Sequence, residues 1–127
     1  MKIQRILIVD DSQTERYFLS DILLRNGFSV STAADGEEAL LKIKSDKPEL
    51  ILMDVVMPGK NGYQITRAIA RDPEMEGVPI FICTSKGQET DRIWGMRQGA
   101  RDYLVKPINA EELLRKIAAL NVATEHD

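Results

Sequence analysis

The sequence is poor in the residues that form disulfides and soft metal sites. Its 127 residues include one cysteine, Cys83, and one histidine, His126. A lone cysteine cannot form an intramolecular disulfide, and zinc sites need nitrogen or sulfur ligands. Cys83 lies inside an apolar run, so we expect a buried and inert thiol. His126 lies in a polar C-terminal segment, where we expect it to have no catalytic role.

Long hydrophobic stretches and basic clusters are also absent. No window approaches the roughly 18 consecutive apolar residues of a membrane span. The first apolar stretch is shorter than the apolar region of a secretory signal, which has about 7–15 residues. The net charge is −3 and no run of Lys or Arg is longer than two, which argues against a nucleic-acid surface. We therefore expect a cytoplasmic protein with no membrane insertion and no nucleic-acid partner.

Five strand-like segments alternate with five helix-like segments, which is typical of α/β proteins with a parallel sheet. The first, third and fourth strand segments are continuously apolar, as central strands are when helices cover both faces. The second alternates between polar and apolar residues, as an edge strand does. This pattern predicts a doubly wound sheet of order 2-1-3-4-5. The expected strands are 5–9, 28–32, 49–53, 79–83 and 102–105.

Helix boundaries support the same alternation. Four expected helix starts carry a capping residue with Glu or Gln three positions later, and these are Ser12, Asp35, Asn61 and Asn109. Gly27 and Gly99 lie where the first and fourth helices should end, and Gly95 interrupts the fourth. The buried side of the first helix is expected to hold Phe18, Ile22 and Leu23, and that of the last helix Leu113, Leu114, Ile117 and Leu120.

The length of the chain fits one domain. We expect a single domain over 1–127, with its core at about 4–120 and a frayed polar tail at 121–127.

Polar residues follow four of the apolar runs at the same end of the predicted sheet. Because the carboxyl ends of parallel strands form the ligand-binding edge of such sheets, these residues should meet there. They are Asp10 and Asp11 after the first run, Asp54 after the third, Thr84 after the fourth and Lys106-Pro107 after the fifth.

This set of residues favours phosphoryl chemistry with magnesium. Three carboxylates at one edge repel each other, and a cation that prefers oxygen ligands and retained water, as Mg²⁺ does, relieves the repulsion. Asp54 stands alone and is the best nucleophile for an aspartyl phosphate, whereas the adjacent Asp10 and Asp11 suit the metal. The Lys106 ammonium and the Thr84 hydroxyl would stabilise the transferring phosphoryl group. Pro107 is a candidate for a cis peptide bond that directs the lysine inward.

Each residue taken alone has a purely structural explanation. A single Asp is more often a cap or a solvating group, and Lys106 and Thr84 would be ordinary surface and strand-end residues. Trp94 and Tyr103 are more often packing residues. The functional interpretation depends on the joint arrangement at four strand ends.

Together these residues closely resemble the receiver domain of bacterial two-component response regulators. The matching elements are Val9-Asp10-Asp11-Ser12, Met53-Asp54, Met57-Pro58-Gly59, Asn61-Gly62, Cys83-Thr84-Ser85, Gly99-Ala100 and Val105-Lys106-Pro107, within about residues 4–120. The resemblance implies a flavodoxin-like (βα)5 three-layer fold and a phosphoacceptor role for Asp54. It implies Mg²⁺ at Asp10, Asp11, Asp54 and the Val56 backbone carbonyl, a phosphate contact by Lys106, and a switch pair in Thr84 and Tyr103.

The segment 84–103 is similar to stand-alone receivers of chemotaxis-like systems that control type IV pili and twitching motility. The resemblance implies a signalling switch that a histidine kinase phosphorylates. The switch protein itself would catalyse only the transfer of the phosphoryl group to its own aspartate and the slow loss of that group. The switch would move the Thr84 hydroxyl and let the Tyr103 ring pass from exposed to buried. A protein partner would then bind the face formed by the fourth helix, fifth strand and fifth helix, or the chain would drain phosphoryl groups from the kinase. Candidate contacts are Arg92, Trp94, Arg97 and Glu112.

Two other functions were weighed against this one. A haloacid-dehalogenase-type phosphatase also forms an aspartyl phosphate, but it requires a second Asp two positions after the nucleophile. Here Ser12 follows Asp10 and Val56 follows Asp54 at that spacing. A flavin carrier with the same strand order would need a phosphate-binding loop after the first strand, where this chain is acidic.

Overall fold

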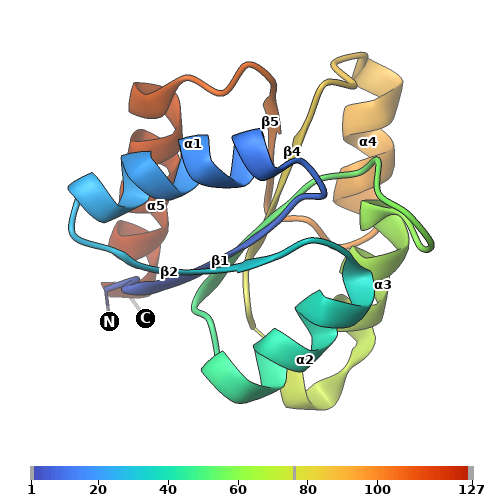
Figure 1. Cartoon of the computed structure of the whole chain (residues 1–127), viewed down its shortest axis with the longest axis horizontal. Helices are drawn as coiled ribbons and strands as arrows, with labels where there is room; N and C mark the ends of the chain where they lie inside the picture. Colours follow the sequence, from blue (N-terminus) through green and yellow to red (C-terminus); the bar gives the residue numbers. More distant parts are fainter. Residues whose placement is uncertain (1, 76, 126–127) are drawn as a thin grey trace.

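In the computed structural model, which describes residues 2–75 and 77–125, parallel strands alternate with α-helices along the chain (Figure 1). The strands are β1 (Arg5–Val9), β2 (Ser29–Ala33), β3 (Leu50–Met53), β4 (Ile80–Thr84) and β5 (Asp102–Val105). The helices are α1 (Gln13–Arg25), α2 (Gly36–Asp46), α3 (Gly62–Arg71), α4 (Glu89–Arg97) and α5 (Ala110–Glu125), with a short 3-10 turn η1 at Pro73–Met75. The sheet order is β2-β1-β3-β4-β5, which confirms the predicted doubly wound topology.

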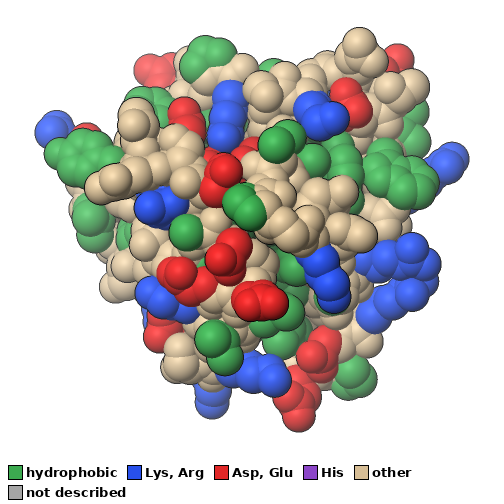
Figure 2. Space-filling model, turned by 45° about the vertical axis from the view of Figure 1, so that its right-hand side comes forward, with side chains coloured by type: hydrophobic (Ala, Val, Ile, Leu, Met, Phe, Trp, Pro, Cys, Tyr) green, Lys and Arg blue, Asp and Glu red, His purple; other side chains and the backbone are tan. Residues whose placement is uncertain are grey.

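The face in Figure 2 carries scattered acidic, basic and hydrophobic side chains. No helix within the described residues combines the length and the apolarity that a bilayer crossing requires.

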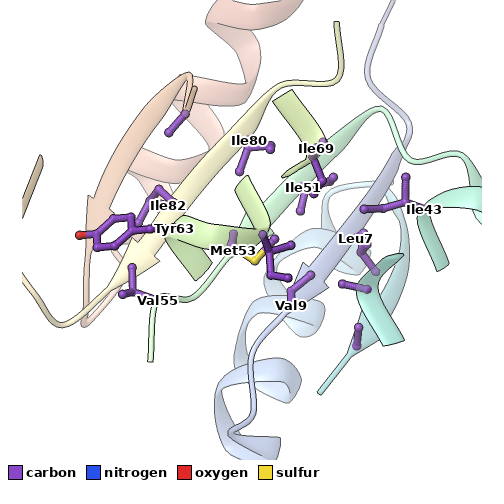
Figure 3. Packing of buried hydrophobic residues seen from close by; sticks show 14 of the residues in the cluster. Leu7, Val9, Ile43, Ile51, Met53, Val55, Tyr63, Ile69, Ile80 and Ile82 are labelled. Atoms are coloured by element: carbon purple, nitrogen blue, oxygen red, sulfur yellow. The ribbon is translucent and has the colours of Figure 1, made fainter. Parts of the chain in front are cut away.

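Helices cover both faces of the sheet and form two separate cores. Alternate strand residues point to opposite faces, so Leu7, Ile51 and Ile82 pack with α2 and α3 on one side, as Figure 3 shows for this cluster. Their neighbours Ile8 and Leu52 pack with α1 and α5 on the other side. Burial on both faces explains why the central strands read as unbroken apolar runs.

The predicted capping residues form the expected bonds. The side chains of Ser12 and Asp35 accept hydrogen bonds from the backbone N–H groups of Glu15 and Glu38, and that of Asn109 accepts one from Glu112. Asn61 and Gln64 form a reciprocal capping box at the start of α3. Gly27 and Gly99 have φ angles of 87° and 110° just after α1 and α4, which is the left-handed conformation that glycine adopts most readily.

Two local expectations about the helices are wrong. In α1 the buried residues are Leu19 and Leu23, which lie one turn apart on the same side, whereas Phe18 is 40% exposed. Gly95 does not interrupt α4, which is continuous from Glu89 to Arg97. It is buried, and a Cβ atom there would lie 3.2 Å from the rings of Tyr63 and Tyr103. The glycine therefore leaves room for two aromatic rings.

The C-terminal segment is also more ordered than expected. Helix α5 continues to Glu125, so residues 121–125 are helical rather than frayed. The Asn121 side-chain oxygen accepts a hydrogen bond of 2.7 Å from the backbone N–H of Ile3, which ties this end of α5 to the start of the chain. His126 lies outside the described residues.

Candidate functional site

The sheet register brings the ends of β1 and β3 side by side. Val9 pairs with Met53, and the backbone N–H of Asp54 donates to the Val9 carbonyl at 2.9 Å. The N–H of Asp10 donates in the same way to Ala33 at the end of β2, at 3.0 Å. Asp10 and Asp54 are thus the first residues beyond neighbouring central strands, and backbone bonds fix the relative positions of both.

Three carboxylates gather at this edge. Asp10, Asp11 and Asp54 each offer an oxygen, and these oxygens lie within 4.8 Å of one another. Asp10 and Asp54 are buried, at 2% and 6% exposed, whereas Asp11 is exposed. The cluster is therefore open to solvent on the Asp11 side and closed on the side of the sheet.

Lys106 places a positive charge between the two buried carboxylates. Its ammonium nitrogen lies 2.7 Å from Asp10 Oδ2 and 3.4 Å from Asp54 Oδ1. The Lys106 backbone N–H donates to the Thr84 carbonyl at 2.8 Å, and the Lys106–Pro107 peptide bond is cis. Burial lowers the pKa of Lys106, but the hydrogen bond to Asp10 and the charge of Asp54 more than offset this and raise it above the ordinary value.

One lysine does not neutralise the cluster. Burial, followed by the negative charge of Asp10, raises the pKa of Asp54 from 3.8 to about 6, and the charge of Lys106 offsets only part of this rise. Two buried carboxylates and an exposed third therefore share a single cation. Crowded carboxylate oxygens that repel each other form a donor set suited to a hard divalent ion such as Mg²⁺.

The loop after β3 is held close to Asp54 by the start of α3. A Cβ atom on Gly62 would collide with the backbone carbonyl of Asp54, so only glycine permits this approach. The Gly62 N–H donates to the Val55 carbonyl at 2.9 Å. Val56 is 58% exposed, and its carbonyl accepts no hydrogen bond from the described residues.

Two further residues lie near Asp10 that the sequence pattern does not assign to the site. Arg16 donates from Nη1 to the Asp10 backbone carbonyl at 2.7 Å, which anchors the first turn of α1 to the site. Glu15 has a buried carboxylate oxygen that finds no hydrogen-bond partner among the described residues. Both lie in the first turns of the helix that follows the acidic pair, and that proximity is the only signal that could have identified them.

Thr84 and Tyr103 lie on neighbouring strands, as expected, but within the described residues their side chains form no hydrogen bond with each other. The Thr84 side chain is fully buried, and its hydroxyl accepts a long, 3.4 Å hydrogen bond from the Lys86 N–H. The Tyr103 ring was expected to start exposed, yet it is 3% exposed. Its hydroxyl donates to the Lys86 carbonyl at 2.6 Å, and the space beside Gly95 accommodates the ring.

The four candidate partner contacts do not share one face. Arg92 lies 4.0 Å from Asp102 of β5, and Glu112 lies in the first turn of α5. Trp94 and Arg97 instead line a hollow between α4 and α3. Within the face formed by α4, β5 and α5, the first pair is therefore better placed than the second.

This geometry agrees with known proteins. Residues 6–118 match the family model described as the response regulator receiver domain. Protein PilH of Pseudomonas aeruginosa is 50% identical over 116 residues, which cover 91% of this chain and 96% of PilH. Other curated relatives are DNA-binding response regulators, of which this chain spans 50% of the length.

Solved structures that contain CheY proteins are also similar to this chain. The chemotaxis response regulator CheY4 of Vibrio cholerae superposes with a TM-score of 0.85 at 34% identity, covering 93% of this chain and 98% of that one. A CheX–CheY–BeF₃–Mg²⁺ complex from Borrelia burgdorferi matches with a TM-score of 0.85 at 28% identity, covering 92% and 88% of the two chains. Because the family model spans most of the sequence and the fold, strand order and acidic edge agree with it, this chain belongs to the response regulator receiver domain family.

Proposed function

We propose that this receiver domain is a phosphorylation-dependent switch that accepts a phosphoryl group on Asp54. Receiver domains are signalling proteins rather than classical enzymes, which argues against the phosphatase and flavin-carrier alternatives. The observation that carries the proposal is the position of Asp54, buried with its Oδ1 atom 3.4 Å from the Lys106 ammonium and within 4.8 Å of the other two carboxylates. A partly buried carboxylate of raised pKa is ionised at neutral pH and more basic than an ordinary aspartate, which favours nucleophilic attack.

The proposed phosphoryl transfer to Asp54 is a single displacement at phosphorus. An Asp54 oxygen attacks phosphorus of a phosphohistidine on a histidine kinase, forming a P–O bond as the P–N bond breaks. The electron pair of that bond stays on the imidazole, which takes up a proton from solvent. Charge spreads over the equatorial phosphoryl oxygens, where the Lys106 ammonium can donate after releasing Asp10. Catalysis by this chain is limited to that transfer and the slow hydrolysis of its own acyl phosphate.

Asp10, Asp11, Asp54 and the backbone carbonyl of Val56 would hold Mg²⁺ in this proposal. The donor set suits it, because the three carboxylate oxygens converge and the Val56 carbonyl accepts no bond from the described residues. When bound, the ion would neutralise negative charge on the transferring phosphoryl group. The residues themselves orient the acceptor, since backbone bonds fix Asp10 and Asp54 on their strands.

The proposed output uses Thr84, Tyr103 and the face formed by α4, β5 and α5. A phosphoryl oxygen on Asp54 would draw the Thr84 hydroxyl toward it, and the Lys86 segment that now bonds Thr84 and Tyr103 would move with it. A protein partner would bind the altered face; that such a fold can form a complex with another protein is supported by the CheX–CheY–BeF₃–Mg²⁺ complex from Borrelia burgdorferi. Draining phosphoryl groups from the kinase would need no such partner.

The resemblance to PilH supports a pilus-related role. We extend the proposal to a single receiver domain, residues 1–127, that works in the cytoplasm within a chemotaxis-like system controlling pilus-based motility.

Acetyl phosphate with Mg²⁺ tests the acceptor. Intact-mass measurement should show one added phosphoryl group on the parent protein and on Asp46→Asn, a control at an exposed aspartate on α2. Asp54→Asn should show none. Equal labelling of Asp54→Asn and the parent would overturn the proposal.

A further inference from the structure

A hollow lies between α3 and α4, away from the carboxylate cluster. Its larger part has a volume of about 390 Å³ and is lined by Arg67, Ala70, Arg71, Trp94, Arg97, Gln98 and Gly99. An adjoining part of about 260 Å³ shares Arg67, Trp94 and Gln98 and reaches Tyr63. These residues together are called the α3–α4 groove below.

The groove concentrates unpaired positive charge. Arg67, Arg71 and Arg97 are exposed, and none forms an ion pair or hydrogen bond within residues 2–75 and 77–125. By contrast, Arg5 and Arg25 pair with nearby carboxylates. No acidic side chain of the described part of the chain lines either part of the groove. Three guanidinium groups in a protein of net charge −3 thus form a local basic site.

An aromatic surface lies among these arginines. Trp94 is the only tryptophan of the sequence, and it is 51% exposed, although burying such a ring would be favourable. Toward the right of Figure 2, a group of Lys and Arg side chains lies beside exposed hydrophobic side chains. Tryptophan, tyrosine and arginine are the residues that contribute most often to binding energy at protein interfaces, and lysine and glutamate contribute least.

We propose that the α3–α4 groove binds an acidic segment of a partner protein. Its carboxylates would pair with Arg67, Arg71 and Arg97 in the two-pronged geometry that guanidinium groups favour, and an apolar side chain would cover Trp94. Three cations suit a short acidic segment. A nucleic acid would extend past them onto a surface that is acidic overall, and an anionic membrane would favour a larger cluster, of roughly 4–8 Lys or Arg residues.

The groove is separate from the face proposed for the phosphorylated state, but the two communicate. Tyr63 lines the groove, and its hydroxyl oxygen lies 3.2 Å from that of Tyr103. Helix α4 separates the groove from β5. Binding of the acidic segment and the position of the Tyr103 ring would therefore influence each other.

A displayed library of random peptides provides the first test. The library is selected on the parent protein and counter-selected on the variant Arg67→Gln/Arg71→Gln/Arg97→Gln. The proposal predicts enrichment of peptides that combine several Asp or Glu residues with an aromatic or leucine. Enrichment of no peptide, or of peptides without acidic residues, overturns it.

Trp94 reports binding directly, because it is the only tryptophan. The enriched peptide, made without tryptophan, should shift its emission, and the triple variant should bind at least about tenfold more weakly. The control Lys44→Gln/Arg101→Gln/Arg115→Gln removes the same charge at exposed positions outside the groove and should bind like the parent. Both variants should accept phosphate from acetyl phosphate, which separates failure of this proposal from failure of the phosphoacceptor proposal.

Two outcomes would refute the assignment of the partner class. Equal weakening by the control variant would mean that general charge, not the groove, attracts the peptide. Binding of a single-stranded oligonucleotide or of phosphatidylglycerol vesicles that depends on the three arginines and exceeds peptide binding would identify a different partner.

Discussion

The hydroxyl oxygens of Tyr63 and Tyr103 lie 3.2 Å apart, which joins α3 to β5 through a single side-chain contact. Each hydroxyl has one proton to donate. The Tyr103 proton goes to the Lys86 carbonyl at 2.6 Å, so Tyr63 donates either to Tyr103 or to the Asp91 carbonyl, which is also 3.2 Å away. Burial, followed by the hydrogen bond shared with Tyr63, raises the pKa of Tyr103, so its ring stays neutral. The position of the Tyr103 ring, the proposed switch, therefore depends on contacts with α3 and α4.

Removing the Tyr63 hydroxyl should loosen this arrangement without affecting phosphorylation. Tyr63→Phe is expected to lower the free energy of unfolding by about 1 kcal/mol, the usual effect of one lost buried hydrogen bond, and to broaden the ring resonances of Tyr103. Tyr17→Phe, at a residue that is 75% exposed, is the matched control and should do neither. Urea unfolding and NMR of the tyrosine rings measure both effects. Identical behaviour of the two variants would mean that the contact is not formed in solution.

Gly95 should resist a substitution that usually stabilises helices. Alanine gains about 1 kcal/mol over glycine at an open helix position, but here the added Cβ would lie 3.2 Å from both tyrosine rings. Overpacking typically costs about 1–3 kcal/mol. We expect Gly95→Ala to be less stable than the parent in urea unfolding, with shifted Tyr103 ring signals. A more stable variant with unchanged ring signals would show that the rings yield freely.

The stability of the metal-free protein should depend on pH through Asp54. Its pKa is about 6 in the folded protein, against an ordinary value of 3.8. A carboxyl group whose pKa rises on folding stabilises the protein below the unfolded-state pKa, and this contribution is lost as the pH rises through the folded-state value. The free energy of unfolding should therefore be lower above the folded-state pKa than below the unfolded-state pKa, by on the order of 2–3 kcal/mol.

Asp54→Asn removes that dependence. In EDTA the variant should match the parent near pH 4 and exceed its free energy of unfolding by about 2–3 kcal/mol near pH 8. The exposed-site control Asp46→Asn should track the parent at both values. If the gap between Asp54→Asn and the parent is the same at both ends of this range, the carboxyl group is not crowded as described.

Magnesium binding should depend on Asp11 more than on Lys106. Asp11→Ala deletes a proposed ligand and should weaken binding by at least about tenfold in calorimetry. Lys106→Ala deletes a cation that contacts Asp10 and Asp54 and competes with the metal, so it should retain binding yet lose the conformational response to phosphorylation. Asp46→Ala serves as the surface control. Asp11→Ala binding as tightly as the parent would remove Asp11 from the ligand set.

The features that the sequence predicts correctly are those set by neighbouring residues. Cap residues act within one helical turn, and the apolar runs of β1, β3 and β4 indicate burial on both faces by themselves. The acidic edge could be predicted because strand direction alone brings the ends of parallel strands together. None of these inferences requires side-chain geometry.

The expectations that are wrong, and the features that were missed, depend instead on how distant segments of the chain pack together. Which side of α1 meets the sheet depends on how the helix is rotated on it, and one position around the helix exchanges Leu19 for Phe18. From the sequence alone, Gly95 suggests a break in the helix. The structure shows instead that the rings of Tyr63 and Tyr103 lie close to where a side chain at this position would be. The arginines of the α3–α4 groove are scattered in the sequence, and only the fold gathers them. Contacts between distant segments leave no local pattern.

The hydrogen bond between Ile3 and Asn121 joins the N-terminal segment of the chain to helix α5. This contact lies just before the start of β1, whereas Asp10 and Asp54 follow the carboxyl ends of β1 and β3. A circularly permuted protein, joined across this contact and opened at the turn near Gly77, should keep the same strand order and the same acidic edge. The order in which the strands are synthesised would then be incidental, and the pairing of their faces would alone specify the architecture.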